Sequence, residues 1–161
     1  MILTMRPMVP EDRPGLERLL SRIKVFNRED QSIAMDLVDF AIRNPRQNDY
    51  DFILAFDGSE QLIGYACFGP TPMTDRTFDL YWIAVDPDFS GQGVGKVLLK
   101  KVEAEISGQK GRMIIIETSS APEYAPSRGF YLRNNYLLAE TIKDFFRQGE
   151  DRVTYVKVLG Q

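Results

Sequence analysis

The stretch Asp79-Leu-Tyr-Trp-Ile-Ala-Val-Asp-Pro-Asp-Phe-Ser-Gly-Gln-Gly-Val-Gly-Lys96 decides the fold of this chain. It begins with a nearly continuous apolar run up to Val85, which is typical of a strand covered on both faces. A glycine-rich turn follows, and from Val94 apolar residues recur every four positions, which predicts a helix ending near Gly108. Residues 113–118 form a second buried strand. Strand, helix and strand make a βαβ unit, so the two strands should be parallel with a right-handed crossover.

The sequence on both sides of this unit predicts further elements by its hydrophobic periodicity. We expect strands over 1–6, 51–56, 61–68, 136–142 and 153–158, and helices over 16–23, 27–44 and 122–134. The second helix begins at Asn27 and should bury the stripe Ile33, Leu37 and Ala41. A loop over 143–152 joins the last two strands. The order β-α-α-β-β-β-α-β-α-β-β describes an α/β fold, with a mixed sheet and helices on both faces.

Length and composition are those of one globular domain. The 161 residues, 43% hydrophobic and 27% charged, can bury one sizeable core, so residues 1–161 are expected to form a single domain. The net charge of −3 creates no basic field that would attract nucleic acid. Neither a secretory signal nor a long apolar segment is visible, so we expect a cytoplasmic protein that does not bind membranes.

The chain contains one cysteine, Cys67, and no histidine. An internal disulfide and a zinc site built from Cys and His are therefore excluded, and we expect no metal. Catalytic arrangements that depend on a histidine base are excluded as well. Acid and base roles must fall to Asp, Glu, Tyr, Lys, water or the substrate, while Cys67 lies in an apolar strand pattern and is expected to be an inert core thiol.

The glycines at 91, 93 and 95 form the most informative motif. In a turn that opens a helix, they let backbone N–H groups converge on an anion such as a pyrophosphate, although such a turn can also serve tight packing alone. A P-loop does not fit, because Ser90 replaces its first glycine and Val97 its hydroxyl residue. A dinucleotide fingerprint fails in both frames, where Lys96 or Leu98 takes the place of the last glycine.

The motif resembles the acetyl-CoA signature of the GCN5-related N-acetyltransferase (GNAT) family, Gln/Arg-x-x-Gly-x-Gly/Ala. Gly93 and Gly95 fill the glycine positions, while Ser90 stands where Gln or Arg is usual. Residues 124–136 are similar to the family block Asn-x-x-Ala-x-x-Phe-Tyr-Glu-Lys-x-Gly-Phe, and they match at Phe130, Tyr131 and Tyr136. In this block Tyr124 replaces Asn, Ser127 replaces Ala, and Asn135 replaces Gly, a position where Asn can adopt a left-handed turn. The likeness covers essentially the whole chain.

The resemblance implies a binding site for acetyl-CoA between two parallel strands that splay apart. The pantetheine arm would pair with the backbone of Ile83, Ala84 and Val85 like an added strand. The pyrophosphate would lie on the backbone amides of Gly91, Gln92, Gly93, Val94, Gly95 and Lys96. Tyr124 and Ser127, in the second block, are also expected at the cofactor.

The resemblance implies transfer of an acetyl group to a primary amine by direct attack in a ternary complex. Tyr131 matches the tyrosine that faces the sulfur and is the expected general acid. Asp79 holds the position of a carboxylate that acts as a base through water, and Glu117 is the second candidate; either could instead be solvated or paired with arginine. The rival reading is a non-catalytic acyl-CoA-binding module that acts as a sensor or assembly subunit.

The acceptor stays open in the sequence. A small amino-acid-like metabolite and a protein amine are both compatible with it, and another short acyl group could replace acetyl. Phe145 and Phe146 fall in the expected loop and should be covered by a second subunit in a homodimer or by the acceptor.

Overall fold

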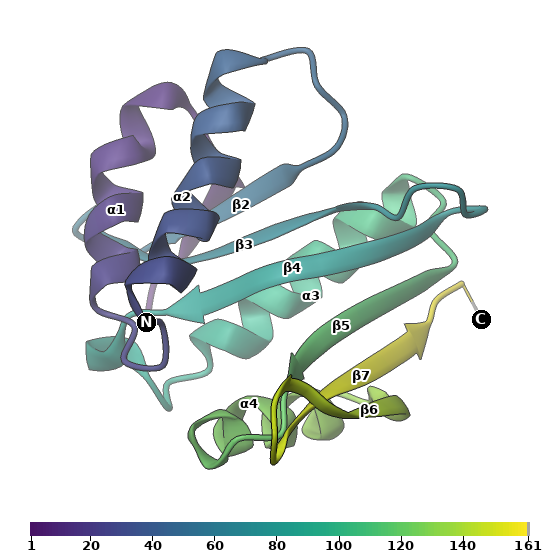
Figure 1. Ribbon diagram of the computed structural model, residues 1–161. Coiled ribbons are helices and arrows are strands. Elements are labelled where there is room, and N and C mark those ends of the chain that lie inside the picture. Colours follow the sequence, from purple (N-terminus) through teal and green to yellow (C-terminus); the bar gives the residue numbers. More distant parts are fainter. Residues whose placement is uncertain (161) are drawn as a thin grey trace.

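A computed structural model of the protein describes residues 1–160 and contains one seven-stranded mixed sheet. The strand order is β1-β2-β3-β4-β5-β7-β6, and β4 and β5 form the parallel pair that the βαβ unit predicts (Figure 1). The predicted α/β fold is therefore confirmed. The strands are β1 (Thr4–Pro7), β2 (Asp51–Phe56), β3 (Leu62–Pro70), β4 (Thr77–Val85), β5 (Met113–Ser119), β6 (Leu137–Arg147) and β7 (Glu150–Val158).

The helices cover the two faces of the sheet and create two cores. They are α1 (Arg13–Ser21), α2 (Arg28–Arg43), α3 (Val94–Gly108) and α4 (Ala125–Arg133). Helices α1 and α2 cover one face of the sheet, and α3 and α4 lie on the other (Figure 1). Buried leucines of α1 pack with α2 and β3, while α3 and Tyr131 of α4 pack against β4, β5 and β7. None of the helices described within residues 1–160 combines the length and apolar character needed to cross a membrane.

The second helix begins as predicted, but the face that it buries is shifted at its first turns. Asn27 accepts a hydrogen bond from the Asp30 amide at 2.8 Å, and the Asp30 carboxylate accepts one from the Asn27 amide at 3.0 Å. The predicted stripe is wrong at Ile33, which is 48% exposed, whereas Ala41 is buried and Leu37 packs against the core as expected. The helix is rotated so that small Ala34 faces the core, where it allows close packing against α1 and the sheet; the buried residues are Ala34, Met35, Val38 and Ala41.

The closing hairpin is longer than predicted, and the loop over 143–152 is wrong. Strand β6 continues to Arg147 and β7 begins at Glu150, with Gly149 in the tight turn at φ +88°. Phe145 and Phe146 therefore lie on the edge strand β6, where each is about half exposed. The guanidinium carbon of Arg152 lies 4.7 Å from the centre of the Phe145 ring, so this ring is partly covered within the chain.

Candidate functional site

Strands β4 and β5 separate after a short parallel contact. Their pairing runs only from Thr77 opposite Met113 to Asp79 opposite Ile115, although β4 continues to Val85 and β5 to Ser119 (Figure 1). Opposite β3, the register shift between Cys67 and Phe68 skips Tyr81, which forms a β-bulge in β4. Because a bulge bends its strand, it helps to turn β4 away from β5. The edge of β4 beyond Asp79 is left without a neighbouring strand.

The glycine turn holds a row of unused backbone donors. Gly91 at φ +75° and Gly93 at φ +83° are left-handed, and Gly93 caps the N-terminus of α3. Within residues 1–160, no backbone amide from Gly91 to Lys96 donates to a protein acceptor. A Cβ added at Gly91 or Gly93 would meet no protein atom within 4 Å, so the space above the amides is open. Free donors at a helix N-terminus suit a phosphate group.

A cavity of about 840 Å³ connects this turn with β4 and α4, and its volume lies in the range of small-molecule sites. Nine of the predicted cofactor residues line it: Ile83, Ala84, Val85, Gly91, Gly93, Val94, Gly95, Lys96 and Ser127. Gln92 and Tyr124 do not. The side-chain Nε2 of Gln92 donates to the Asp88 carbonyl at 3.3 Å, and the Tyr124 hydroxyl lies 3.4 Å from the Val25 carbonyl.

Six further residues line the cavity that sequence reasoning did not assign to the cofactor: Phe89, Ser90, Pro126, Phe130, Arg133 and Asn134. The sequence contained a signal for two of these residues, namely their spacing along the predicted helix. Arg133 and Asn134 lie three residues beyond Phe130 and Tyr131, and residues three apart share a helix face.

Tyr131 lies at the cavity on α4 and is 7% exposed. Its ring packs among those of Phe130, Tyr136 and Tyr155, with centroids 5.7, 6.2 and 5.9 Å away. The hydroxyl has no hydrogen-bond partner in the part of the chain that the structure describes, so it is free to donate. Burial and, to a lesser extent, the neighbouring Tyr155 raise the pKa of Tyr131, which keeps the phenol protonated at neutral pH.

The two candidate bases lie outside the cavity lining. Asp79 is the last β4 residue paired with β5, and its Oδ2 accepts hydrogen bonds from Thr71 Oγ1 at 2.7 Å and the Tyr81 hydroxyl at 3.4 Å. Burial, and next the Asp79 charge, raise the pKa of Tyr81. The side chain of Glu117 is 46% exposed and lies 3.6 Å from Arg152 Nη1. Asp79 is therefore closer to the point where the strands part, and Glu117 is ion-paired.

An ion pair with a buried carboxylate holds the start of the glycine turn. Asp86, 1% exposed, accepts hydrogen bonds from Arg22 at 2.9 and 3.1 Å and from the Asp88 amide at 2.9 Å. Arg22 Nη2 also donates to Asp88 Oδ2 at 2.8 Å. Burial opposes ionisation of Asp86, but the bonds from Arg22 and the Asp88 amide outweigh it, so the pKa of Asp86 is lowered. Arg22 thus links the end of α1 to the turn.

We expect Arg22→Met to lose stability in a pH-dependent way. The folded pKa of Asp86 lies below its ordinary value of 3.8. The ion pair therefore stabilises the fold fully at pH values above about 3.8, the pKa of Asp86 in the unfolded chain. This stabilisation is lost as the pH falls through the pKa of Asp86 in the folded protein. Urea unfolding of wild type and variant should show a gap at pH 7 that closes in acid. The control is Arg13→Met, which breaks the ion pair between Arg13 and Asp39, whose atoms lie 2.6 Å apart at a place remote from the turn. Coenzyme A binding should weaken only in Arg22→Met.

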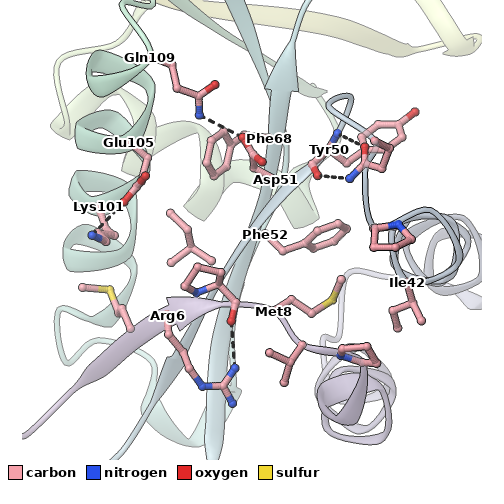
Figure 2. Close-up of a pocket in the computed structure, with 18 residues that line it drawn as sticks. Arg6, Met8, Ile42, Tyr50, Asp51, Phe52, Phe68, Lys101, Glu105 and Gln109 are labelled. Atoms are coloured by element: carbon pink, nitrogen blue, oxygen red, sulfur yellow. Dashed lines mark hydrogen bonds and ion pairs between the residues drawn. The ribbon is translucent and has the colours of Figure 1, made fainter.

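A smaller hollow of about 440 Å³ lies at the β1 and β2 edge of the sheet, between α2 and α3 (Figure 2). Its polar side chains bond to one another or to nearby backbone. Gln109 donates to Asp51 at 3.1 Å, Lys101 lies 3.0 Å from Glu105, and Gln47 donates to the Tyr50 carbonyl at 2.8 Å (Figure 2). The cavity at the glycine turn, with its unused amides, is therefore the better candidate for the functional site.

Cys67 is fully buried in β3. Burial, and next the charge of Asp51, raise the pKa of its thiol. A protonated, enclosed thiol is a poor nucleophile, as expected for an inert core residue.

Comparison with known proteins identifies a family. The family model described as an acetyltransferase (GNAT) domain matches residues 48–136. A protein from Desulfovibrio desulfuricans assigned to the GNAT acetyltransferase family is 34% identical, with a TM-score of 0.95 over 99% of this chain and 100% of that one. No curated protein matches the sequence.

Two more distant structures share the fold. The ribosomal-protein-S18-alanine N-acetyltransferase of Escherichia coli is 16% identical, with a TM-score of 0.78 over 99% of this chain and 96% of that one. The PaiA N-acetyltransferase of Thermoplasma acidophilum, solved with coenzyme A, is 17% identical, with a TM-score of 0.77 over 99% and 100%.

Proposed function

The chain belongs to the GNAT acetyltransferase family, and we propose that it transfers an acetyl group from acetyl-CoA to a primary amine by direct attack in a ternary complex. The observation that carries the proposal is the row of unused amides from Gly91 to Lys96, which opens into a cavity beside the free edge of β4. These two features fit the two parts of coenzyme A. The amides suit its pyrophosphate, and the strand edge suits the amide groups of its pantetheine arm.

Bound acetyl-CoA would supply a thioester, whose carbonyl carbon is open to attack by an amine. The backbone of Ile83, Ala84 and Val85 would hold the pantetheine arm in the gap between β4 and β5. Gly91, Gly93 and Gly95 would let the turn approach the pyrophosphate, with Lys96 adding a positive charge at the cavity wall. Ser127 lines the same cavity from α4.

Transfer requires a neutral amine. An amine with the pKa of lysine, ~10.4, is neutral in only about 0.04% of molecules at pH 7. We propose that Asp79, at the point where the strands part, accepts the amine proton through a bridging water. The amine nitrogen then forms a bond to the carbonyl carbon and releases its second proton to solvent, the carbon–sulfur bond breaks, and the thiolate leaves with its electron pair. Tyr131 gives the thiolate a proton and regains one from solvent.

Thiol release tests the function. We expect the protein to bind coenzyme A in calorimetry with a chelator present, and to release thiol from acetyl-CoA when pooled amines are added. Pools of small amino-acid-like amines and of peptides with free N-termini or lysines would identify the acceptor class, which is a protein alanine in the Escherichia coli structural neighbour. Binding without thiol release from any pool would favour the non-catalytic module instead.

Four broader expectations stay predictions. That residues 1–161 act as one domain is supported by the single sheet that contains all seven strands. Placement in the cytoplasm and action without a metal rest on the sequence. A homodimer is suggested by the half-exposed Phe145 and Phe146 on the edge strand β6.

We expect Asp79→Asn to lower kcat/KM by roughly tenfold near pH 6, below the usual range for a direct base because the proton moves through water. Asparagine keeps an oxygen for the Thr71 hydroxyl, so the change removes mainly the charge. The loss should shrink as the pH approaches the pKa of the acceptor, since the amine then supplies its own neutral form.

Glu117→Gln is the matched control and should change kcat/KM little, because Arg152 keeps its contact with Glu140 at 3.1 Å. The roles are reversed if Glu117→Gln loses the acidic limb of the pH profile while Asp79→Asn keeps it. If both variants keep the wild-type profile, no carboxylate acts as the base.

A further inference from the structure

A nearly buried carboxylate on α3 connects this helix to the C-terminal part of the sheet. Glu103 is 8% exposed, and its Oε2 accepts hydrogen bonds from the Tyr136 hydroxyl at 2.9 Å and from Lys157 Nζ at 3.0 Å. Its other oxygen lies 3.4 Å from Lys100 Nζ. A buried charge is costly unless it is paired, so these partners hold Glu103 in place.

The same network reaches the last turn of α4. Lys157 Nζ also donates to the Asn134 carbonyl at 3.2 Å, and Asn134 Nδ2 donates to the Phe130 carbonyl at 2.8 Å. The Tyr136 amide donates to the Tyr131 carbonyl at 3.0 Å across Asn135, which is left-handed at φ +69°. The residue that carries the free phenol is thus tied through its own backbone to Glu103.

We propose that Glu103 is a positioning residue that sets the distance between the Tyr131 hydroxyl and the glycine turn. One helix carries both ends of the constraint, because α3 begins at the turn and Glu103 lies nine residues after Val94, about 14 Å along the axis. Acetyl-CoA would be fixed by its pyrophosphate at the start of α3. The position of α4, which the network sets, would then decide whether the Tyr131 hydroxyl reaches the sulfur. This role rests on the proposed function of Tyr131 as general acid.

Two variants test the role, with one control. Glu103→Gln keeps the shape and removes the charge that holds Lys157, while Tyr136→Phe removes one hydroxyl and serves if Glu103→Gln does not fold. Glu105→Gln removes a carboxylate on the surface of the same helix and should behave as wild type. Within residues 1–160, the Glu105 carboxylate pairs only with Lys101, at 3.0 Å. Each of the two test variants should lower kcat about tenfold, because a small misplacement of a catalytic group is costly. KM for acetyl-CoA, and Kd for coenzyme A by calorimetry, should stay within about twofold, since the turn is unchanged.

A double-mutant cycle separates positioning from general stabilisation. In the Tyr131→Phe background, Glu103→Gln or Tyr136→Phe should cost no more than about twofold further, since the hydroxyl they position is gone. An equal loss of kcat in both backgrounds, or a matching rise in the Kd for coenzyme A, would overturn the positioning role while leaving Tyr131 as the acid. If Tyr131→Phe alone keeps wild-type turnover, the acid assignment fails first and the positioning role fails with it.

Discussion

Gly93→Asp should raise the Kd for coenzyme A by at least about a hundredfold, since a charge placed about 4 Å from another costs up to ~4 kcal/mol near a protein surface. The new carboxylate would point into the open space above the amides, where the structure has no protein atom within 4 Å of a Cβ. A pyrophosphate bound there would meet both the added atoms and a negative charge. Calorimetry with coenzyme A measures the loss.

Two controls separate this effect from backbone strain, because Gly93 is left-handed at φ +83°. Gly93→Asn has nearly the same size and tolerates this conformation best, so it should bind much better than Gly93→Asp. Gly149→Asp places the same side chain on a glycine at φ +88°, in the turn between β6 and β7, and should leave binding unchanged. Normal binding by a folded Gly93→Asp protein would show that the turn is not the phosphate site.

The βαβ unit and the glycine turn could be predicted because their signals are local. The apolar run to Val85, the turn and the four-residue period after Val94 lie within one short segment, and the structure places β4 and α3 at nearly the expected bounds. The burial of the first turns of α2 could not be predicted, because it depends on how α1 and the sheet meet the helix. Ala34 and Ile33 are neighbours in sequence, and only tertiary packing selects the smaller residue for the core.

The candidate site divides in the same way. Residues that the turn itself presents, such as Gly91 and Gly93, line the cavity as predicted. Contacts between distant segments left no local signal. Arg22 lies 64 residues before Asp86, and Glu103 lies 54 residues before Lys157, so neither pair could be recognised before the fold was known. The ion pair between Glu117 and Arg152 likewise depends on the pairing of β5 with β7.

Tyr131→Phe should leave the fold and the Kd for coenzyme A unchanged while lowering turnover by roughly a hundredfold, the lower part of the range for a positioned acid. The hydroxyl has no hydrogen-bond partner within residues 1–160, so its removal breaks no bond in the folded protein, and the phenyl ring keeps its packing against Tyr136 and Tyr155. Because the pKa of Tyr131 is raised, the phenol should keep its proton at all pH values up to about 10. Loss of this proton should therefore not lower the activity in that pH range.

Tyr65→Phe is the matched control for Tyr131→Phe. Tyr65 is fully buried under α1 and α2 and lines neither cavity, and its hydroxyl also has no hydrogen-bond partner among residues 1–160. Removing that hydroxyl should keep turnover and preserve or raise the free energy of unfolding, since an unpartnered buried hydroxyl is costly. Single-turnover thiol release should be measured for both variants, so that slow product release does not hide the chemical step. Equal single-turnover rates in wild type and Tyr131→Phe would return Tyr131 to a packing role, with water left to protonate the thiolate.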